Sequence, residues 1–232
     1  FKVKARDGKT DIYGLMYVPS DFDPSKKYPV IDATYSGPQA VRTPKNFAGG
    51  YSNYDRSIAE LGFAVSTIDG LGSAWRSKAF HDVSYQNLGD IGAADHIGGI
   101  KQLTATRPWM DLERVGIYGH SAGGYDAVRA MLTHPEFYKA AVSSAGNHDH
   151  RIAKAWWPEQ YMGRPGKHYD EQSNLNLAGN LEGKLLLVHG DMDNNVNTAS
   201  SLRLAAELVK HNKDFELLII PNRNHGLADH PY

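Results

Sequence analysis

The sequence predicts an α/β domain, spanning residues 1–232, whose central sheet is mostly parallel and is covered by helices on both faces. Short apolar runs rich in Val, Ile and Leu, bounded by Gly, Pro or Asp, recur along the chain in the manner of buried parallel strands. Amphipathic segments with helical spacing lie between these runs, and such alternation is typical of a parallel sheet. The length of 232 residues suits one large domain.

The expected strands follow one another with helices between them. Looser alternation at residues 11–18 is expected to form an antiparallel strand near the edge of the sheet. Buried strands are expected at residues 30–35, 63–68, 114–118, 140–144, 184–189 and 215–220. Helices are expected at residues 54–61 and 89–106, from Ser121 onward and after Thr198. Residues 146–183 show neither pattern clearly, and their aromatic and Asn content indicates a long functional loop.

The composition excludes several classes of protein. The chain has no Cys, which excludes a disulfide scaffold, a Cys-ligated zinc site, an iron–sulfur cluster and a thiol nucleophile. Its 25 Lys and Arg nearly balance its 26 Asp and Glu, and without a basic block we expect no nucleic-acid partner. No apolar run approaches the ~18 residues that a membrane span needs, so this segment is expected to contain none.

No cofactor or metal site is expected. The chain lacks both a phosphate-binding Gly-rich loop and a His-Glu-x-x-His pattern. His148-Asp149-His150 contains metal-ligating residue types, but two neighbouring ligands with no third partner are a weak signal. Most other histidines, His96 among them, are expected on surfaces or in loops, and His189 is expected to be packed at the end of a buried strand.

A serine nucleophile is indicated by Gly119-His120-Ser121-Ala122-Gly123, which follows an expected strand and precedes an expected helix. This is the G-x-S-x-G pattern of a nucleophile elbow in its strand–turn–helix setting. The turn is tight and strained, so the positions two residues from the serine need glycine. The turn is expected to present the serine hydroxyl above the sheet, at the N-terminal end of the helix.

A serine nucleophile needs a general base, and the base needs a carboxylate that orients it. Asp191 and Asp193 both follow the expected strand at 184–189, and His225 follows the strand at 215–220. Both loops leave the carboxyl edge of the sheet, where open parallel sheets place their sites. The order Ser, Asp, His is that of the α/β hydrolases, and the residues alone leave Asp191 and Asp193 as equal candidates.

Further motifs accompany these residues in a fixed order. They are Tyr35-Ser36-Gly37-Pro38, Asp69-Gly70-Leu71-Gly72-Ser73, Gly119-His120-Ser121-Ala122-Gly123-Gly124-Tyr125, Tyr161-Met162-Gly163, His189-Gly190-Asp191-Met192-Asp193-Asn194-Asn195-Val196 and Asn224-His225-Gly226. Together they resemble the catalytic domain of the prolyl oligopeptidase family, specifically its dipeptidyl peptidase IV branch. The resemblance runs from about Tyr13 to the end of the chain, and it implies an α/β-hydrolase fold and a serine peptidase.

The resemblance also implies the roles of individual residues. Ser121 matches the family nucleophile, and His225 matches its general base and acid. Asp193, rather than Asp191, matches the carboxylate, because it stands directly before Asn194-Asn195-Val196. Tyr35 matches the tyrosine that forms the oxyanion hole together with the backbone N–H of the residue after the serine, here Ala122.

A pocket for Pro or a small residue before the cleaved bond is implied in the same way. Asn195 matches a side chain that contacts the substrate backbone, and Val196, Trp157 and Ala145 match positions around the pocket. Three positions depart from the family pattern, and one of them is Leu71, which stands where many members carry arginine. Ala122 stands where dipeptidyl peptidase IV has a tyrosine, and Trp157 is larger than the usual tyrosine.

The predicted function is the hydrolysis of peptide bonds in short peptides through a serine ester, as in a dipeptidyl peptidase. A carboxylesterase or acylaminoacyl-peptidase-like hydrolase is the first alternative, and a non-catalytic hydrolase-like binding domain is the second. The expected partners are the short peptide, an N-terminal β-propeller of the same longer chain, and a second copy in a homodimer. In the family the propeller holds the peptide amino terminus. An exported or periplasmic location is favoured over a cytoplasmic one.

Overall fold

The central sheet contains both parallel and antiparallel strands. The computed structural model describes residues 1–47, 50 and 54–227, and within these ranges eight strands form one sheet in the order β1-β2-β4-β3-β5-β6-β7-β8. Six strands run parallel: β3 (Tyr28–Ala33), β4 (Ala64–Asp69), β5 (Met110–His120), β6 (Ala140–Ser144), β7 (Lys184–Gly190) and β8 (Glu216–Ile220). Strand β1 (Lys2–Lys4) pairs antiparallel with β2 (Asp11–Tyr17), and β2 pairs antiparallel with β4. The predicted mostly parallel sheet is confirmed.

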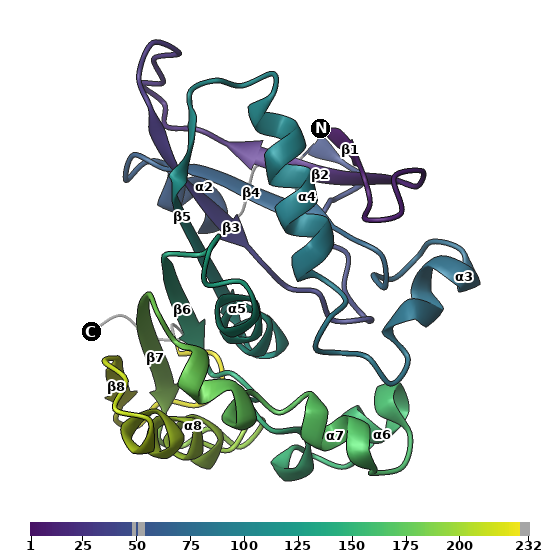
Figure 1. Ribbon diagram of the computed structural model, residues 1–232, viewed down its shortest axis with the longest axis vertical. Coiled ribbons are helices and arrows are strands. Elements are labelled where there is room, and N and C mark those ends of the chain that lie inside the picture. Colours follow the sequence, from purple (N-terminus) through teal and green to yellow (C-terminus); the bar gives the residue numbers. More distant parts are fainter. Residues whose placement is uncertain (48–49, 51–53, 228–232) are drawn as a thin grey trace.

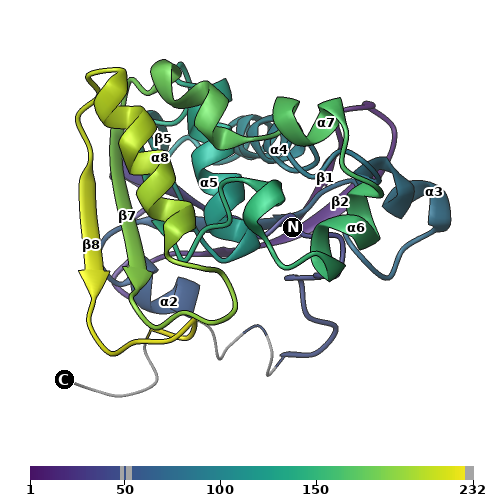
Figure 2. The ribbon, with the colours of Figure 1, turned by 90° about the horizontal axis from the view of Figure 1, so that it is seen from below.

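Helices cover both faces of the sheet (Figure 1). Helices α4 (Ala93–Thr104), α5 (Ala122–Thr133) and α8 (Ala199–Lys210) lie on one face, and α2 (Tyr54–Ala59) lies on the other (Figure 2). All six residues of β4 are buried, because this strand is covered on both sides. Helix α5 packs on β5 and β6, and its apolar residues Val128, Met131 and Leu132 are all buried.

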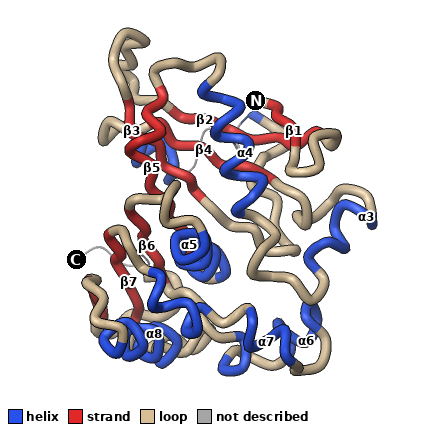
Figure 3. Tube along the Cα trace, viewed as in Figure 1, coloured by secondary structure: helices blue, strands red, loops and turns tan. Residues whose placement is uncertain are grey.

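The prediction that residues 146–183 lack regular structure is wrong. They contain helices α6 (Trp156–Met162) and α7 (Lys167–Glu171) and two 3₁₀ turns, His150–Ile152 and Asn174–Asn180 (Figure 3). Helices of two turns or fewer are too short to show an apolar period in the sequence. They are held by tertiary packing instead, since Met162 and Tyr169 join a small buried cluster with Leu88 and Ile91. Helix α3 (Lys78–His81), followed by the 3₁₀ turn Asp82–Ser84, was likewise not predicted.

The expectation that His96 lies at the surface is also wrong. Its ring is buried, with Nδ1 2.8 Å from Oδ1 of Asp32 on β3, and the Tyr138 hydroxyl donates to Oδ2 of the same carboxylate at 2.8 Å. A buried carboxylate needs such partners, because removing an unpaired charge from water costs much free energy. The His96 side chain of α4 therefore lies in the core, where Asp32 on β3 is its hydrogen-bond partner.

The sheet brings four loops to one edge. Tyr35 lies two residues past the end of β3, Ser121 directly follows β5, and Asp193 and His225 follow β7 and β8. The neighbouring strands are parallel, so these loops emerge side by side although their residues are far apart in the sequence. Within the described residues, no helix has both the length and the apolar character that crossing a membrane requires.

Candidate active site

Ser121 lies on a strained turn between β5 and α5. Its backbone has φ 60° and ψ −122°, a conformation that non-glycine residues rarely adopt. The neighbouring glycines allow the turn: a Cβ on Gly119 would lie 2.2 Å from the carbonyl oxygen of Gly123, and a Cβ on Gly123 would lie 2.4 Å from that of Thr34. The Ser121 N–H donates to the carbonyl of Ser144 on β6 at 2.7 Å, which fixes the turn to the sheet.

A chain of hydrogen bonds joins Ser121, His225 and Asp193. His225 Nε2 is 2.9 Å from Ser121 Oγ, and His225 Nδ1 is 2.7 Å from Asp193 Oδ2. The Asp193 carboxylate is buried, whereas Asp191 is exposed at the surface. The geometry therefore brings together the three residues that the resemblance implies and leaves Asp191 outside the chain of hydrogen bonds.

Asp193 is held in its ionised form by donors on several sides. Its Oδ1 accepts the backbone N–H groups of Asn195 at 2.8 Å and Val196 at 2.9 Å. Burial raises the pKa of Asp193, but the hydrogen bonds from His225, Asn195 and Val196 outweigh it, so the pKa lies below its usual value. A carboxylate that is ionised and fixed in place can orient the His225 ring and select its tautomer.

Two further histidines flank this carboxylate and base. His189 is buried, as predicted: Nδ1 lies 2.8 Å from Ser201 Oγ, and Nε2 donates to the Val196 carbonyl at 2.9 Å. The His120 ring lies 4.7 Å from the His225 ring, with its Nδ1 2.9 Å from Ser144 Oγ. Burial, and then the nearby His225, lower the pKa of His120 to about 4, so His120 is neutral at pH 7. Sequence reasoning did not anticipate that His120 would lie beside His225.

Tyr35 and Ala122 line the same pocket as Ser121. The Tyr35 hydroxyl accepts a hydrogen bond from Gln39 Nε2 at 2.9 Å. Burial, together with the nearby Asp126 carboxylate, raises the pKa of Tyr35, while hydrogen bonding to Gln39 and Ser121 opposes the rise. The hydroxyl thus keeps its proton at neutral pH and is available as a donor beside the serine.

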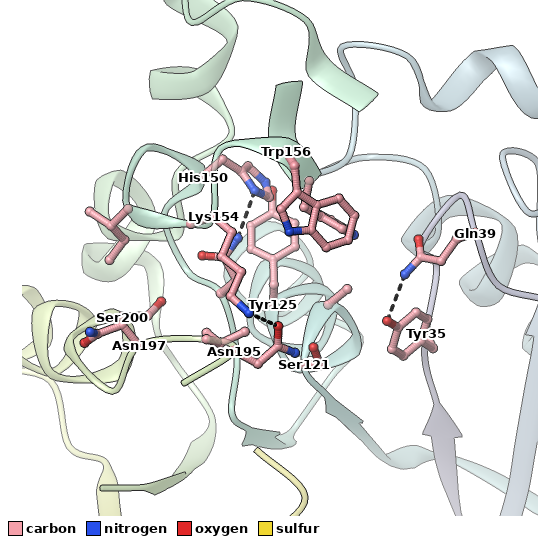
Figure 4. Close-up of a pocket in the computed structure, with 16 residues that line it drawn as sticks. Tyr35, Gln39, Ser121, Tyr125, His150, Lys154, Trp156, Asn195, Asn197 and Ser200 are labelled. Atoms are coloured by element: carbon pink, nitrogen blue, oxygen red, sulfur yellow. Dashed lines mark hydrogen bonds between the residues drawn. The ribbon is translucent and has the colours of Figure 1, made fainter. Parts of the chain in front are cut away.

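A pocket opens beside the Ser121 hydroxyl (Figure 4). It has an empty volume of about 770 Å³ including its open mouth. Of the predicted substrate residues, Asn195, Val196 and Trp157 line it, and the Asn195 Oδ1 accepts a hydrogen bond from Lys154 Nζ at 3.0 Å. Ala145 does not line it: this residue is fully buried, and its N–H donates to the Val188 carbonyl on β7.

Several lining residues were not predicted. They are Gln39, Tyr125, Asn147, His150, Ile152, Ala153, Lys154, Trp156, Asn197 and Ser200.

His150 belongs to the His148-Asp149-His150 segment, which contains metal-ligating residue types, and its ring stacks on Trp157 with the centroids 5.8 Å apart. Burial lowers the pKa of His148 to about 3 and that of His150 to about 4. Among the described residues no group of three metal-ligating side chains converges.

Comparison with known proteins places this site in a family. Dipeptidyl peptidase 8 of Homo sapiens is 31% identical over 233 residues, which cover 98% of this chain and 26% of that protein. Prolyl endopeptidase FAP of Mus musculus is 29% identical over 236 residues, which cover 97% of this chain and 30% of that protein. A solved structure of a candidate dipeptidyl aminopeptidase IV from Bacteroides ovatus ATCC 8483 matches with a TM-score of 0.91 and 32% identity, covering 97% of this chain and 32% of that one.

The chain therefore spans about a quarter to a third of the length of these relatives. The likeness to the solved structure confirms the predicted α/β-hydrolase fold. The model of the prolyl oligopeptidase family matches residues 51–232, which is most of the sequence. By this match, the chain belongs to the prolyl oligopeptidase family.

Proposed function

We propose that this chain is the catalytic domain of a serine peptidase that hydrolyses short peptides through an acyl-enzyme. The observation that carries the proposal is the hydrogen-bonded chain from Asp193 through His225 to Ser121, at the mouth of a pocket. A nucleophile, a base within hydrogen-bonding distance and a carboxylate that orients the base are the parts that acyl transfer requires. A binding domain without catalytic activity would have no need of this arrangement.

The geometry supports the following steps. His225 Nε2 removes the Ser121 proton as Oγ attacks the peptide carbonyl, and Asp193 stabilises the imidazolium that forms. The Tyr35 hydroxyl and the Ala122 N–H stabilise the negative charge on the carbonyl oxygen. His225 then gives its proton to the leaving amine, which departs and leaves the acyl group on Ser121. Water, activated by His225, hydrolyses this ester and regenerates the serine.

The residue before the cleaved bond would occupy the pocket beside Ser121. Trp157 and Val196 supply apolar wall, and Asn195 lies where it can contact the substrate backbone. We propose Pro or a small residue at this position, and release of dipeptides. The names of the relatives include both dipeptidyl peptidases and a prolyl endopeptidase. Dipeptide release requires groups that hold the peptide amino terminus, which we assign to an N-terminal β-propeller of a longer chain.

Covalent labelling tests the nucleophile. A fluorophosphonate probe is expected to label the wild-type protein and Ser25→Ala, whose serine lies in an exposed loop, but not Ser121→Ala. Persistent labelling of Ser121→Ala would place the nucleophile elsewhere. Hydrolysis of dipeptidyl-Pro and dipeptidyl-Ala amides is then compared with that of a simple aryl ester. Hydrolysis of the ester alone would favour a carboxylesterase over a peptidase.

A further inference from the structure

The backbone around Tyr35 is tied to both of the elements that flank Ser121. On one side of Tyr35, the Thr34 N–H donates to a backbone carbonyl of β5 at 2.9 Å. On the other side, the Ser36 N–H donates to Asp126 Oδ2 on α5 at 2.6 Å. Strand β5 ends directly before Ser121, and α5 begins directly after it. The two hydrogen bonds therefore fix where the proposed oxyanion-hole tyrosine lies relative to the proposed nucleophile.

The acceptor on α5 has to be a side chain. An α-helix uses its own backbone carbonyls for hydrogen bonds along the helix, so it holds a neighbouring loop through side chains. Asp126 supplies that side chain, five positions after Ser121. The acceptor on β5 is instead a backbone carbonyl, which almost any residue would provide. Of the two ties, only the one to α5 depends on the identity of a residue.

Packing leaves the segment around Tyr35 little room to adjust. An added Cβ on Gly92, just before α4, would lie 1.9 Å from Ser36 Oγ. One on Gly123 would lie 3.2 Å from Cδ2 of the Tyr35 ring, so this ring lies against the first turn of α5. Gln39 Nε2 donates to the Tyr35 hydroxyl, whose own O–H remains a donor (Figure 4). The position of that hydroxyl thus follows from where the backbone at Tyr35 is fixed.

We propose that Asp126 is a positioning residue that holds Tyr35 in the oxyanion hole. This inference rests on the proposed peptidase function. Without the Asp126 carboxyl group, the Ser36 N–H loses its acceptor and the chain at Tyr35 shifts relative to Ser121. A displacement of about 1 Å at an active site can lower a rate by about 10²-fold. Because the hydroxyl acts on charge that develops in the transition state, the loss should fall on kcat and not on KM.

Isosteric variants test the proposal on the full-length enzyme. Asp126→Asn keeps an oxygen acceptor, whereas Asp126→Leu has a similar shape and no acceptor. At pH 7, kcat for a dipeptidyl-Pro amide is expected to fall by about 10–100-fold in Asp126→Leu, with KM little changed, and to stay close to the wild-type value in Asp126→Asn. Asp214→Leu, at a strongly exposed carboxylate, is the control and is expected to keep kcat. An unchanged kcat in Asp126→Leu, or an equal loss in Asp126→Asn, would overturn the proposal.

A double-mutant cycle separates positioning of Tyr35 from a general loss of structure. In the Tyr35→Phe background the hydroxyl is already absent, so Asp126→Leu is expected to lower kcat there by less than about twofold. The same fold loss with and without the Tyr35 hydroxyl would overturn the proposal, because Asp126 would then act on another part of the protein. Asp126→Ala is carried through the same cycle, so the result does not depend on the folding of one variant.

The rate at which a fluorophosphonate labels Ser121 gives the same comparison without a peptide. The phosphoryl oxygen of the probe takes the place of the peptide carbonyl oxygen, so labelling should slow by a similar factor in Asp126→Leu and not in Asp126→Asn. If the wild-type enzyme did not hydrolyse the dipeptidyl-Pro amide, the proposed function would fail. The labelling rates would still decide whether Asp126 positions Tyr35, since equal rates in wild type and Asp126→Leu would overturn the proposal.

Discussion

Asp191 and Asp193 lie two positions apart in the turn after β7, yet their surroundings differ completely. Asp191 faces solvent, while Asp193 accepts hydrogen bonds from His225 and from two backbone N–H groups. Those N–H groups belong to Asn195 and Val196, so the backbone of the turn itself fixes the carboxylate. This explains why Asp193 and not Asp191 can hold the imidazole, because only a fixed and ionised carboxylate orients a base.

At the same scale, Tyr35 is expected to contribute a single hydrogen bond to the transition state. Tyr35→Phe keeps the ring and removes the hydroxyl, so kcat for a peptide amide should fall by about 10²–10³-fold while KM changes little. Steady-state kinetics measures both values. Tyr54→Phe, at a residue that is 80% exposed on α2, is the control and is expected to leave kcat unchanged. An unchanged kcat in Tyr35→Phe would remove this hydroxyl from the oxyanion hole.

At the scale of elements, the active site depends on how closely α5 approaches the sheet. The helix begins directly after Ser121, and almost every one of its residues is buried. It packs on β5, on β6 and on the 3₁₀ turn Asn174–Asn180. Close approach of the first turn to β3 needs a glycine, because no side-chain atom fits between Gly123 and the Thr34 carbonyl. Ser121 is thus positioned by the packing of two elements and not by its own contacts alone.

Gly123→Ala tests this packing. Its Cβ would lie 2.4 Å from the Thr34 carbonyl oxygen, so the turn has to shift. Overpacking of this kind costs about 1–3 kcal/mol in the free energy of unfolding, and the rate of fluorophosphonate labelling should fall with it. The matched control is Gly98→Ala on α4, where no atom lies within 4 Å of the added Cβ. There alanine should stabilise the protein by about 0.5–1 kcal/mol, and equal urea-denaturation midpoints for the two variants would contradict the packing argument.

At the scale of the whole molecule, a small internal cavity lies between β3, α4 and α5. It is lined by charged residues from three elements, Asp32 on β3, His96 on α4 and Asp126 on α5, and by Ser36. Asp126 Oδ2 accepts the N–H of Ser36 at 2.6 Å, directly after Tyr35 in the chain. Burial raises the pKa of Asp126, which is about 7 after the Ser36 N–H and His96 lower it and Asp32 adds a smaller rise.

This carboxyl should make the stability of the fold depend on pH. Because its folded pKa lies above the usual 3.8, the folded state binds more protons than the unfolded state between about pH 4 and 7, and stability falls as pH rises through that range. Asp126→Asn cannot titrate, so its stability relative to wild type should increase by on the order of a few kcal/mol from pH 4 to pH 7 and then level off. Urea denaturation at several pH values measures this difference.

The control for this prediction is Asp214→Asn, at a strongly exposed carboxylate between β7 and β8. It is expected to leave the pH profile of stability close to that of the wild type, since exposed ion pairs contribute little. If Asp126→Asn followed the wild-type profile at every pH, the carboxyl would not titrate in the expected range.

Several features were predictable because they depend on local patterns. Strands appear as apolar runs, and the elbow as glycines spaced around Ser121. The prediction that the run at 215–220 is buried is wrong, because β8 lies at the edge of the sheet with Leu217 and Leu218 exposed. The helices within 146–183 were not predictable, because they are short and held by neighbours such as Leu88 and Ile91. The burial of His96 was also not predictable, because it depends on a tertiary contact with Asp32, which lies 64 residues away in the sequence.

By itself, the sequence determined the α/β class of this protein, the position of its candidate serine nucleophile and the loops that carry the candidate acid and base. Only the tertiary structure decided which aspartate meets His225, that Ala145 lies outside the pocket, and that His150 stacks on Trp157 beside it. The physical reason is distance along the chain. Ser121 and His225 are 104 residues apart, so their contact follows from strand order and helix packing, which no local pattern specifies.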